Sequence, residues 1–209
     1  MSKNLYINGS VVISDNNKVY KNNLLLFQHQ QTESAIFLRS IYDYFDFKYP
    51  KYFKMDKLSK LGWLAAEILL IDEVSLANYR PHQIGVILSN KNASLDTDIK
   101  YFETTKMMAS PSLFVYTLPN IVIGEICIRN NFKGENSFFI SDFFNADFLE
   151  QYVNLIFNDK ETEACICGWV DCFENKFRAV LFLIERQKEN GSICFSANNL
   201  NKTNNIDNG

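Results

Sequence analysis

The side chains that could act as nucleophiles or metal ligands include five cysteines, namely Cys127, Cys165, Cys167, Cys172 and Cys194. Cys165 and Cys167 lie two residues apart in an apolar run, so on a strand both thiols would point to one face. A tetrahedral metal site needs further ligands, and the sequence shows none beside this pair. We interpret these thiols, and that of Cys127, as buried and inert, and we predict neither metal nor cofactor.

The other candidate groups are two histidines and a pair of acidic residues. His29 lies in a polar run and His82 directly follows a proline, so we interpret both as surface residues without a catalytic role. Asp96 and Asp98 could chelate a cation, but one solvated pair is weak evidence and we assign them to a surface loop. An odd number of cysteines in a chain of 209 residues argues against a disulfide framework and predicts a reducing, cytoplasmic environment.

The elements that must position these groups follow from apolar patterning. Short apolar runs predict strands over residues 5–13, 84–88, 137–141, 164–170, 177–184 and 193–195, with a hairpin turn over 188–191. Helices are expected after Asp56, after Ser110 with a break near Pro119, and from Ala146. Strands that alternate with helices predict an α/β domain with a mainly parallel, mixed sheet of five to six strands, covered by helices on both faces.

Composition limits the remaining choices. A chain of 209 residues with 47% hydrophobic residues suits one compact domain, which we assign to residues 1–197. The asparagine-rich end, residues 198–209, is expected to be a disordered polar tail. A net charge of -3 gives no reason to expect nucleic acid as a partner. The absence of a long apolar stretch predicts no membrane span.

The order of these segments and their residues resemble those of a β-ketoacyl synthase of the thiolase-like fold. The resemblance covers roughly residues 5 to 172 and is closest over 110–114, Pro119-Asn120, Gly124 and 134–137. In particular the chain resembles short ketosynthase-like N-terminal proteins found beside aryl-polyene, flexirubin-type pigment or fatty-acid genes. This resemblance implies a thiolase-like layered half-domain.

Two departures from that family bear on function. In the family, a cysteine sits at a strand-to-helix elbow, where the helix N-terminus lowers the thiol pKa and backbone N–H groups stabilise the oxyanion. Here Phe143 stands at that position, and no cysteine lies between Cys127 and Cys165. Ser141 is the nearest hydroxyl, but no base can be named for it. The family's second half carries two catalytic histidines, whereas both histidines of this chain precede the elbow.

These departures leave more than one function open. The resemblance implies a non-catalytic, chain-length-factor-type subunit that pairs with an active synthase during elongation of fatty acid, aryl polyene or polyketide-type acyl chains on acyl carrier protein. The alternatives are an acyltransferase or condensing enzyme that uses another nucleophile, and an acyl-carrier-protein binding module. Phe143 either fills the core or acts as a plug or gate, and Asp142 and Asn145 are interpreted as helix-capping residues.

The strand before the elbow is the candidate interface. In the resembling family it lies at the sheet edge and pairs antiparallel with the same strand of a second subunit. Here it carries no charge, proline or bulge, the devices that usually protect an edge. We therefore expect this edge to pair with an active synthase or with a second copy of the chain, through Ser137, Phe138, Phe139, Ile140 and Ser141, flanked by Phe114, Tyr116 and Leu118.

Overall fold

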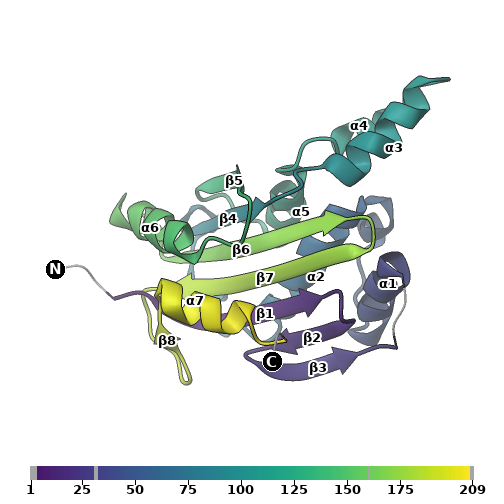
Figure 1. Ribbon diagram of the computed structural model, residues 1–209. Coiled ribbons are helices and arrows are strands. Elements are labelled where there is room, and N and C mark those ends of the chain that lie inside the picture. Colours follow the sequence, from purple (N-terminus) through teal and green to yellow (C-terminus); the bar gives the residue numbers. More distant parts are fainter. Residues whose placement is uncertain (1–3, 31–32, 160, 208–209) are drawn as a thin grey trace.

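One mixed sheet organises the part of the chain that the computed structural model describes, residues 4–30, 33–159 and 161–207 (Figure 1). Its eight strands are β1 Tyr6–Ser14, β2 Lys18–Lys21, β3 Leu24–Gln28, β4 Ile84–Asn90, β5 Asn136–Ile140, β6 Ala164–Phe173, β7 Lys176–Glu185 and β8 Ile193–Cys194. All the predicted strands are present, and the hairpin of β2 and β3 was not predicted.

Four of the seven helices of the described chain begin at a residue whose side chain caps them. The helices are α1 Ser34–Tyr44, α2 Lys57–Leu70, α3 Leu95–Thr105, α4 Pro111–Val115, α5 Ile121–Asn130, α6 Ala146–Ile156 and α7 Ala197–Asn204, with 3-10 turns η1 Pro50–Lys54, η2 Val74–Asn78, η3 Pro81–Gln83 and η4 Phe157–Asp159. The capped helices are α2, α4, α6 and α7. The Asp56 side chain accepts a hydrogen bond from the Ser59 N–H (2.8 Å), and the Ser110 hydroxyl accepts one from the Leu113 N–H (3.4 Å). The predicted starts of α2 and α4 are confirmed.

The sheet is mostly antiparallel, so the prediction of a mainly parallel sheet of five to six strands was wrong. The strand order is β3-β2-β1-β7-β6-β4-β5, with β8 added beside β1. Within the described ranges, the parallel pairs are β4 with β6 and β4 with β5, and the others are antiparallel. The reason is the length of the connections, because β6 and β7 are joined by two residues and must form an antiparallel hairpin. The 188–191 turn does not close a hairpin, since β8 pairs with β1 and not with β7.

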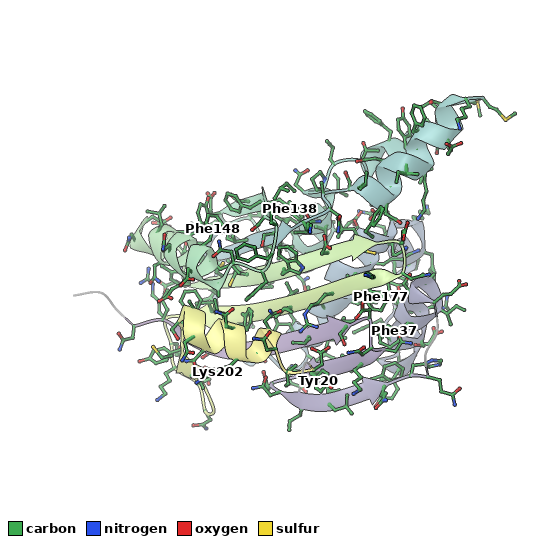
Figure 2. All side chains as sticks on the ribbon, in the orientation of Figure 1. Tyr20, Phe37, Phe138, Phe148, Phe177 and Lys202 are labelled. Carbon is green, nitrogen blue, oxygen red and sulfur yellow. The ribbon has the colours of Figure 1, made fainter. Side chains whose placement is uncertain are left out.

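Two hydrophobic cores lie on opposite faces of the sheet, as the apolar strands predicted. Helices α1, α2 and α5 cover one face, and α6 and α7 cover the other. Phe37 on α1 meets Phe177 on β7 in the first core, with ring centroids 5.7 Å apart (Figure 2). In β6, Gly168 has a φ of 153°, and a Cβ there would lie 1.9 Å from the Val180 carbonyl oxygen. Only glycine allows β6 to pass so close to β7.

The polar end of the chain is structured where it was expected to be disordered. Residues 198–204 belong to α7, which is capped by the Ser196 hydroxyl and buries Leu200 against the second core. The Arg178 Nη1 donates a hydrogen bond to Asp207 Oδ2 (3.1 Å) beyond the helix. Residues 208–209 of the predicted tail lie outside the described residues. No helix in the described ranges is long and apolar enough to cross a membrane.

Candidate partner-binding edge

The last strand of the sheet, β5, has an open edge. It pairs with β4 on one side, and among the described residues no strand pairs with its other side (Figure 1). The Glu135 carbonyl accepts from the Val86 N–H (2.9 Å), and the Ser141 N–H donates to the Asn90 carbonyl (2.8 Å). In a parallel pair, alternate residues bond to the neighbouring strand, so the odd-numbered residues of β5 face β4. The backbone groups of residues 138 and 140 therefore point to the open edge.

The β5 side chains are not equally available to a partner. Phe138 is half-buried against the first core, and Phe139 is half-buried on α6. The Phe139 ring makes edge contacts with Phe148 (4.8 Å) and Tyr152 (4.9 Å) between centroids, and Figure 2 labels Phe138 and Phe148. Ile140, in contrast, is 58% exposed. Ile140 is thus the β5 side chain with the most apolar surface left to bury.

The elbow after β5 keeps its backbone turn without a nucleophile. The Ser141 hydroxyl donates to the Phe143 carbonyl oxygen (2.9 Å), so it closes the turn instead of facing a base. The Asn145 side chain accepts from the Phe148 N–H (2.9 Å) and caps α6, which confirms the capping interpretation for Asn145. Phe143 itself is 64% exposed. It therefore fills no core of this chain, and it could act as a plug only in a cavity of a partner.

A second apolar surface lies on the arm formed by α3, α4 and the loop between them. The arm projects away from the body of the molecule, on the same side of the sheet as β5 (Figure 1). The loop residue Met107 is 97% exposed, and the other exposed large apolar side chains of the arm are Leu95, Ile99, Phe102, Met108, Phe114 and Val115, with Leu118 just beyond α4. Phe102, Met107 and Met108 were not predicted as surface residues from the sequence. Two consecutive methionines before a capped helix start are the signal that could have revealed them.

Of the three residues predicted to flank the interface, Phe114 and Leu118 are exposed and Tyr116 is not. Tyr116 is buried, and its hydroxyl donates to Glu125 Oε1 (3.0 Å). Burial, followed by the nearby Glu125 carboxylate, raises the pKa of Tyr116. The Lys51 ammonium pairs with the other carboxylate oxygen of Glu125 at 2.6 Å. Tyr116 therefore anchors the base of the arm within this chain instead of presenting a surface to a partner.

The remaining candidate groups do not assemble into a site. Burial raises the pKa of both Cys165 and Cys167, and the Cys127 pKa rises to about 11 for the same reason. Such thiols are weak nucleophiles because little thiolate forms near neutral pH. His82 is half-exposed beside the Glu161 carboxylate, at 3.7 Å. No group of three or more histidine, cysteine or acidic residues within the described ranges could hold a metal ion.

Asp96 and Asp98 lie in the first turn of α3 and not in a loop, so that part of the sequence interpretation was wrong. The Asp96 carboxylate pairs with Lys100 at 2.6 Å and with Lys57 at 3.5 Å. Asp98 accepts a hydrogen bond from the Ser94 hydroxyl (3.1 Å). Acidic residues in a first helical turn interact favourably with the helix dipole, which accounts for both positions.

Comparison with known proteins gives matches in structure but not in sequence. No family model and no curated protein matches the chain. The ishigamide ketosynthase/chain length factor has a TM-score of 0.60 at 14% identity, over 87% of this chain and 62% of that chain. The ketosynthase ApeO in complex with its chain length factor ApeC, from Xenorhabdus doucetiae, has a TM-score of 0.58 at 12% identity, over 88% of this chain and 79% of that chain.

A third match is a type II polyketide synthase acyl-carrier protein in complex with its ketosynthase (AntDE:AntF). Its TM-score is 0.57 at 12% identity, over 88% of this chain and 64% of that chain. This chain thus spans about three fifths of the length of the ishigamide and AntDE:AntF chains that it matches, and more of the ApeO–ApeC chain. Identities this low show the fold alone. The chain has the α/β, thiolase-like fold that ketosynthases and chain length factors share.

Proposed function

We propose that this chain is a non-catalytic, chain-length-factor-type subunit that pairs with an active β-ketoacyl synthase and supports acyl chain elongation on acyl carrier protein. The observation that carries the proposal is the open β5 edge, which ends in an elbow with Phe143 where the resembling enzymes have a cysteine. Two of the structural neighbours are a ketosynthase with its chain length factor and an acyl-carrier protein with its ketosynthase.

The edge and the arm together support an interface. Backbone N–H and C=O groups of residues 138 and 140 lack strand partners within the described chain, and such groups favour addition of a strand. Ile140 and Phe143 are exposed apolar side chains at the edge and its elbow, and Phe114 and Met107 are exposed apolar side chains on the arm. Stable obligate interfaces bury about 2,000 Å² or more, which an edge strand plus a projecting helical arm could supply.

The chemistry at the elbow supports a non-catalytic role. A condensing enzyme needs a thiolate at the elbow and bases that accept and return protons. At this elbow the Ser141 hydroxyl is bonded to a backbone carbonyl, and the nearest cysteines by sequence are Cys127 and Cys165. The pKa of both thiols is raised by burial. No observation favours the alternative in which another nucleophile of this chain carries the reaction.

Affinity purification from the native cell tests the proposal. A tagged chain is expected to retain a stoichiometric amount of one β-ketoacyl synthase, identified by peptide mass, and that synthase should elongate acyl-carrier thioesters faster with the chain than without it. The test variant is Ile140→Lys, which alters the open edge and should retain less synthase, and the matched control is Ile36→Lys, which alters a similarly exposed isoleucine on α1. A chain that stays monomeric at micromolar concentration and leaves synthase activity unchanged would refute the proposal.

A further inference from the structure

A pocket outside the edge and the elbow lies between α1, η1, the start of α2, α3 and α4. Its volume is about 300 Å³. Leu38 and Met55, both buried, and the partly exposed Leu113 form its apolar surface. Ligand pockets usually span about 300–1,000 Å³, so this one suits a small molecule with a substantial apolar part.

The polar wall of the pocket is cationic, and three of its four cations have carboxylate partners. Arg39 pairs with Asp43 through its Nε, at 2.8 Å. Lys57 and Lys100 share Asp96, at 3.5 and 2.6 Å. These three cations share two carboxylates, Asp43 and Asp96, so each already has a partner within the chain.

The fourth cation, Lys60, has no carboxylate partner among the described residues, and its ammonium lies 5.7 Å from the centroid of the Tyr52 ring. Burial lowers the pKa of Lys60, and the nearby Asp56 carboxylate opposes that shift. Asp56 is already engaged, because its two oxygens accept hydrogen bonds from the Ser59 N–H (2.8 Å) and the Thr97 hydroxyl (2.7 Å). With four cations and three carboxylates, Asp43, Asp56 and Asp96, the pocket and its paired residues carry a net charge of +1.

We propose that this pocket binds a medium-chain carboxylic acid, with the carboxylate against the Lys60 ammonium and the alkyl chain against Leu38, Met55 and Leu113. One negative charge balances the net charge of the pocket, and an apolar body matches the lining. A charge-assisted hydrogen bond to a partly desolvated ammonium is stronger than one between neutral groups, so the acid is preferred over an uncharged amphiphile. The site is separate from the β5 edge, although Thr97, Lys100 and Leu113 of its lining belong to the arm. Binding of the acid needs no pairing with a synthase.

Calorimetric titration of the full chain with octanoate, 1-octanol and octylamine tests the class of ligand. Octanoate is expected to bind one site, and octanol and octylamine are expected to bind at least about tenfold more weakly, since neither supplies an anion to Lys60. A series of straight-chain acids from six to twelve carbons should show an affinity maximum where the chain fills the pocket. Absence of octanoate binding at millimolar concentration, or equal binding of octanol, would overturn the proposal.

Two variants test the position of the site. Lys60→Met keeps the apolar stem and removes the charge, so octanoate affinity should fall about tenfold while octanol affinity changes little. Lys54→Met, at an exposed lysine outside the lining, is the matched control. Leu113→Glu places a carboxylate against the alkyl chain and should abolish octanoate binding in a chain whose melting temperature shows that it is folded. Unchanged octanoate affinity in either Lys60→Met or Leu113→Glu would refute this position.

Discussion

The replacement of Ile140 by lysine is the most direct test of the partner-binding edge. Ile140 is the exposed apolar side chain of β5, at 58%, and its N–H and C=O point away from β4. A lysine there places a charge on the open edge, a device that native proteins use to prevent strand pairing. The change touches no hydrogen bond to β4, so the fold should survive.

The size of the effect follows from burial. Full burial of an isoleucine side chain stabilises by about 1.5–3 kcal/mol. Since 58% of Ile140 remains to be buried, its removal should weaken association by about 1–2 kcal/mol, or about 5- to 30-fold in the dissociation constant. Desolvation of the lysine ammonium adds to this cost. In a homodimer each interface contains the change twice, so the loss should be about 2–4 kcal/mol.

Sedimentation velocity over a concentration series, with and without the captured synthase, measures the change in the dissociation constant. Ile36→Lys is the control, because Ile36 is 54% exposed on α1, away from β5 (Figure 1). Ile140→Pro is a second probe, since it removes an outward N–H and keeps the β4 ladder. The lost hydrogen bond should cost about 1 kcal/mol of association in addition to the loss of the isoleucine side chain. The reasoning is refuted if Ile140→Lys binds as tightly as the unchanged chain, or if Ile36→Lys weakens binding equally.

Three further outcomes are expected. The chain alone should not turn over malonyl- or acyl-carrier thioesters; a rate above that of buffer, in protein free of synthase, would contradict this. Phe143→Cys should not restore condensing activity without a partner, because the contributions of cooperating catalytic groups to the rate are strongly non-additive, and restoring one group recovers little. Condensation by that variant would reveal a base in this chain. Iodoacetamide at pH 8 should label the exposed Cys194 and spare Cys165 and Cys167, because burial raises the pKa of both buried thiols and so lowers their thiolate fraction. Peptide mass measurement should find these two cysteines labelled only after unfolding. Rapid labelling of Cys165 in the native chain would count against a buried, inert thiol.

The parts of the fold that the sequence predicted are those with local causes. Asp56, Ser110 and Asn145 each cap a helix through their own side chain, and that chemistry is visible in a few consecutive residues. Continuous apolar runs predicted β4, β6 and β7 because these strands are buried on both faces.

The direction of the strands and the short hairpins were harder to predict. The turn before β2 has Asn17 at a φ of 56°, and the turn between β2 and β3 has Asn22 at 50° and Asn23 at 65°. Asparagine tolerates this left-handed region, so these residues indicate the turns of a hairpin that was not predicted from the sequence. Helix α7 has a local start signal in the Ser196 cap, but its apolar contacts come from Ala197 and Leu200, which only the folded sheet can receive.

The candidate edge was located by resemblance, and its detailed surface depends on tertiary packing. Nothing in the sequence around β5 shows that Phe139 meets Phe148 and Tyr152 on α6, or that Ile140 is left exposed. Similarly, the buried hydrogen bond from Tyr116 to Glu125 joins residues of two helices and removes Tyr116 from the predicted interface. The helices that cover a sheet edge determine which of its side chains remain exposed. The periodicity of hydrophobic residues in the sequence does not predict this exposure.

At the turn after β5, the structural requirements for pairing with a partner differ from those for catalysis. Pairing through β5 needs the strand, its open backbone and a turn that leads into α6. The chain keeps these features through the Ser141 and Asn145 hydrogen bonds. Catalysis also needs a thiolate at that turn, and Phe143 cannot provide one. A large apolar side chain in water gains nothing for the isolated chain, but it would gain about 1–2 kcal/mol if a partner buried its 64% exposed surface. The open β5 edge and the exposed aromatic ring at the elbow are the features that the proposed binding role requires.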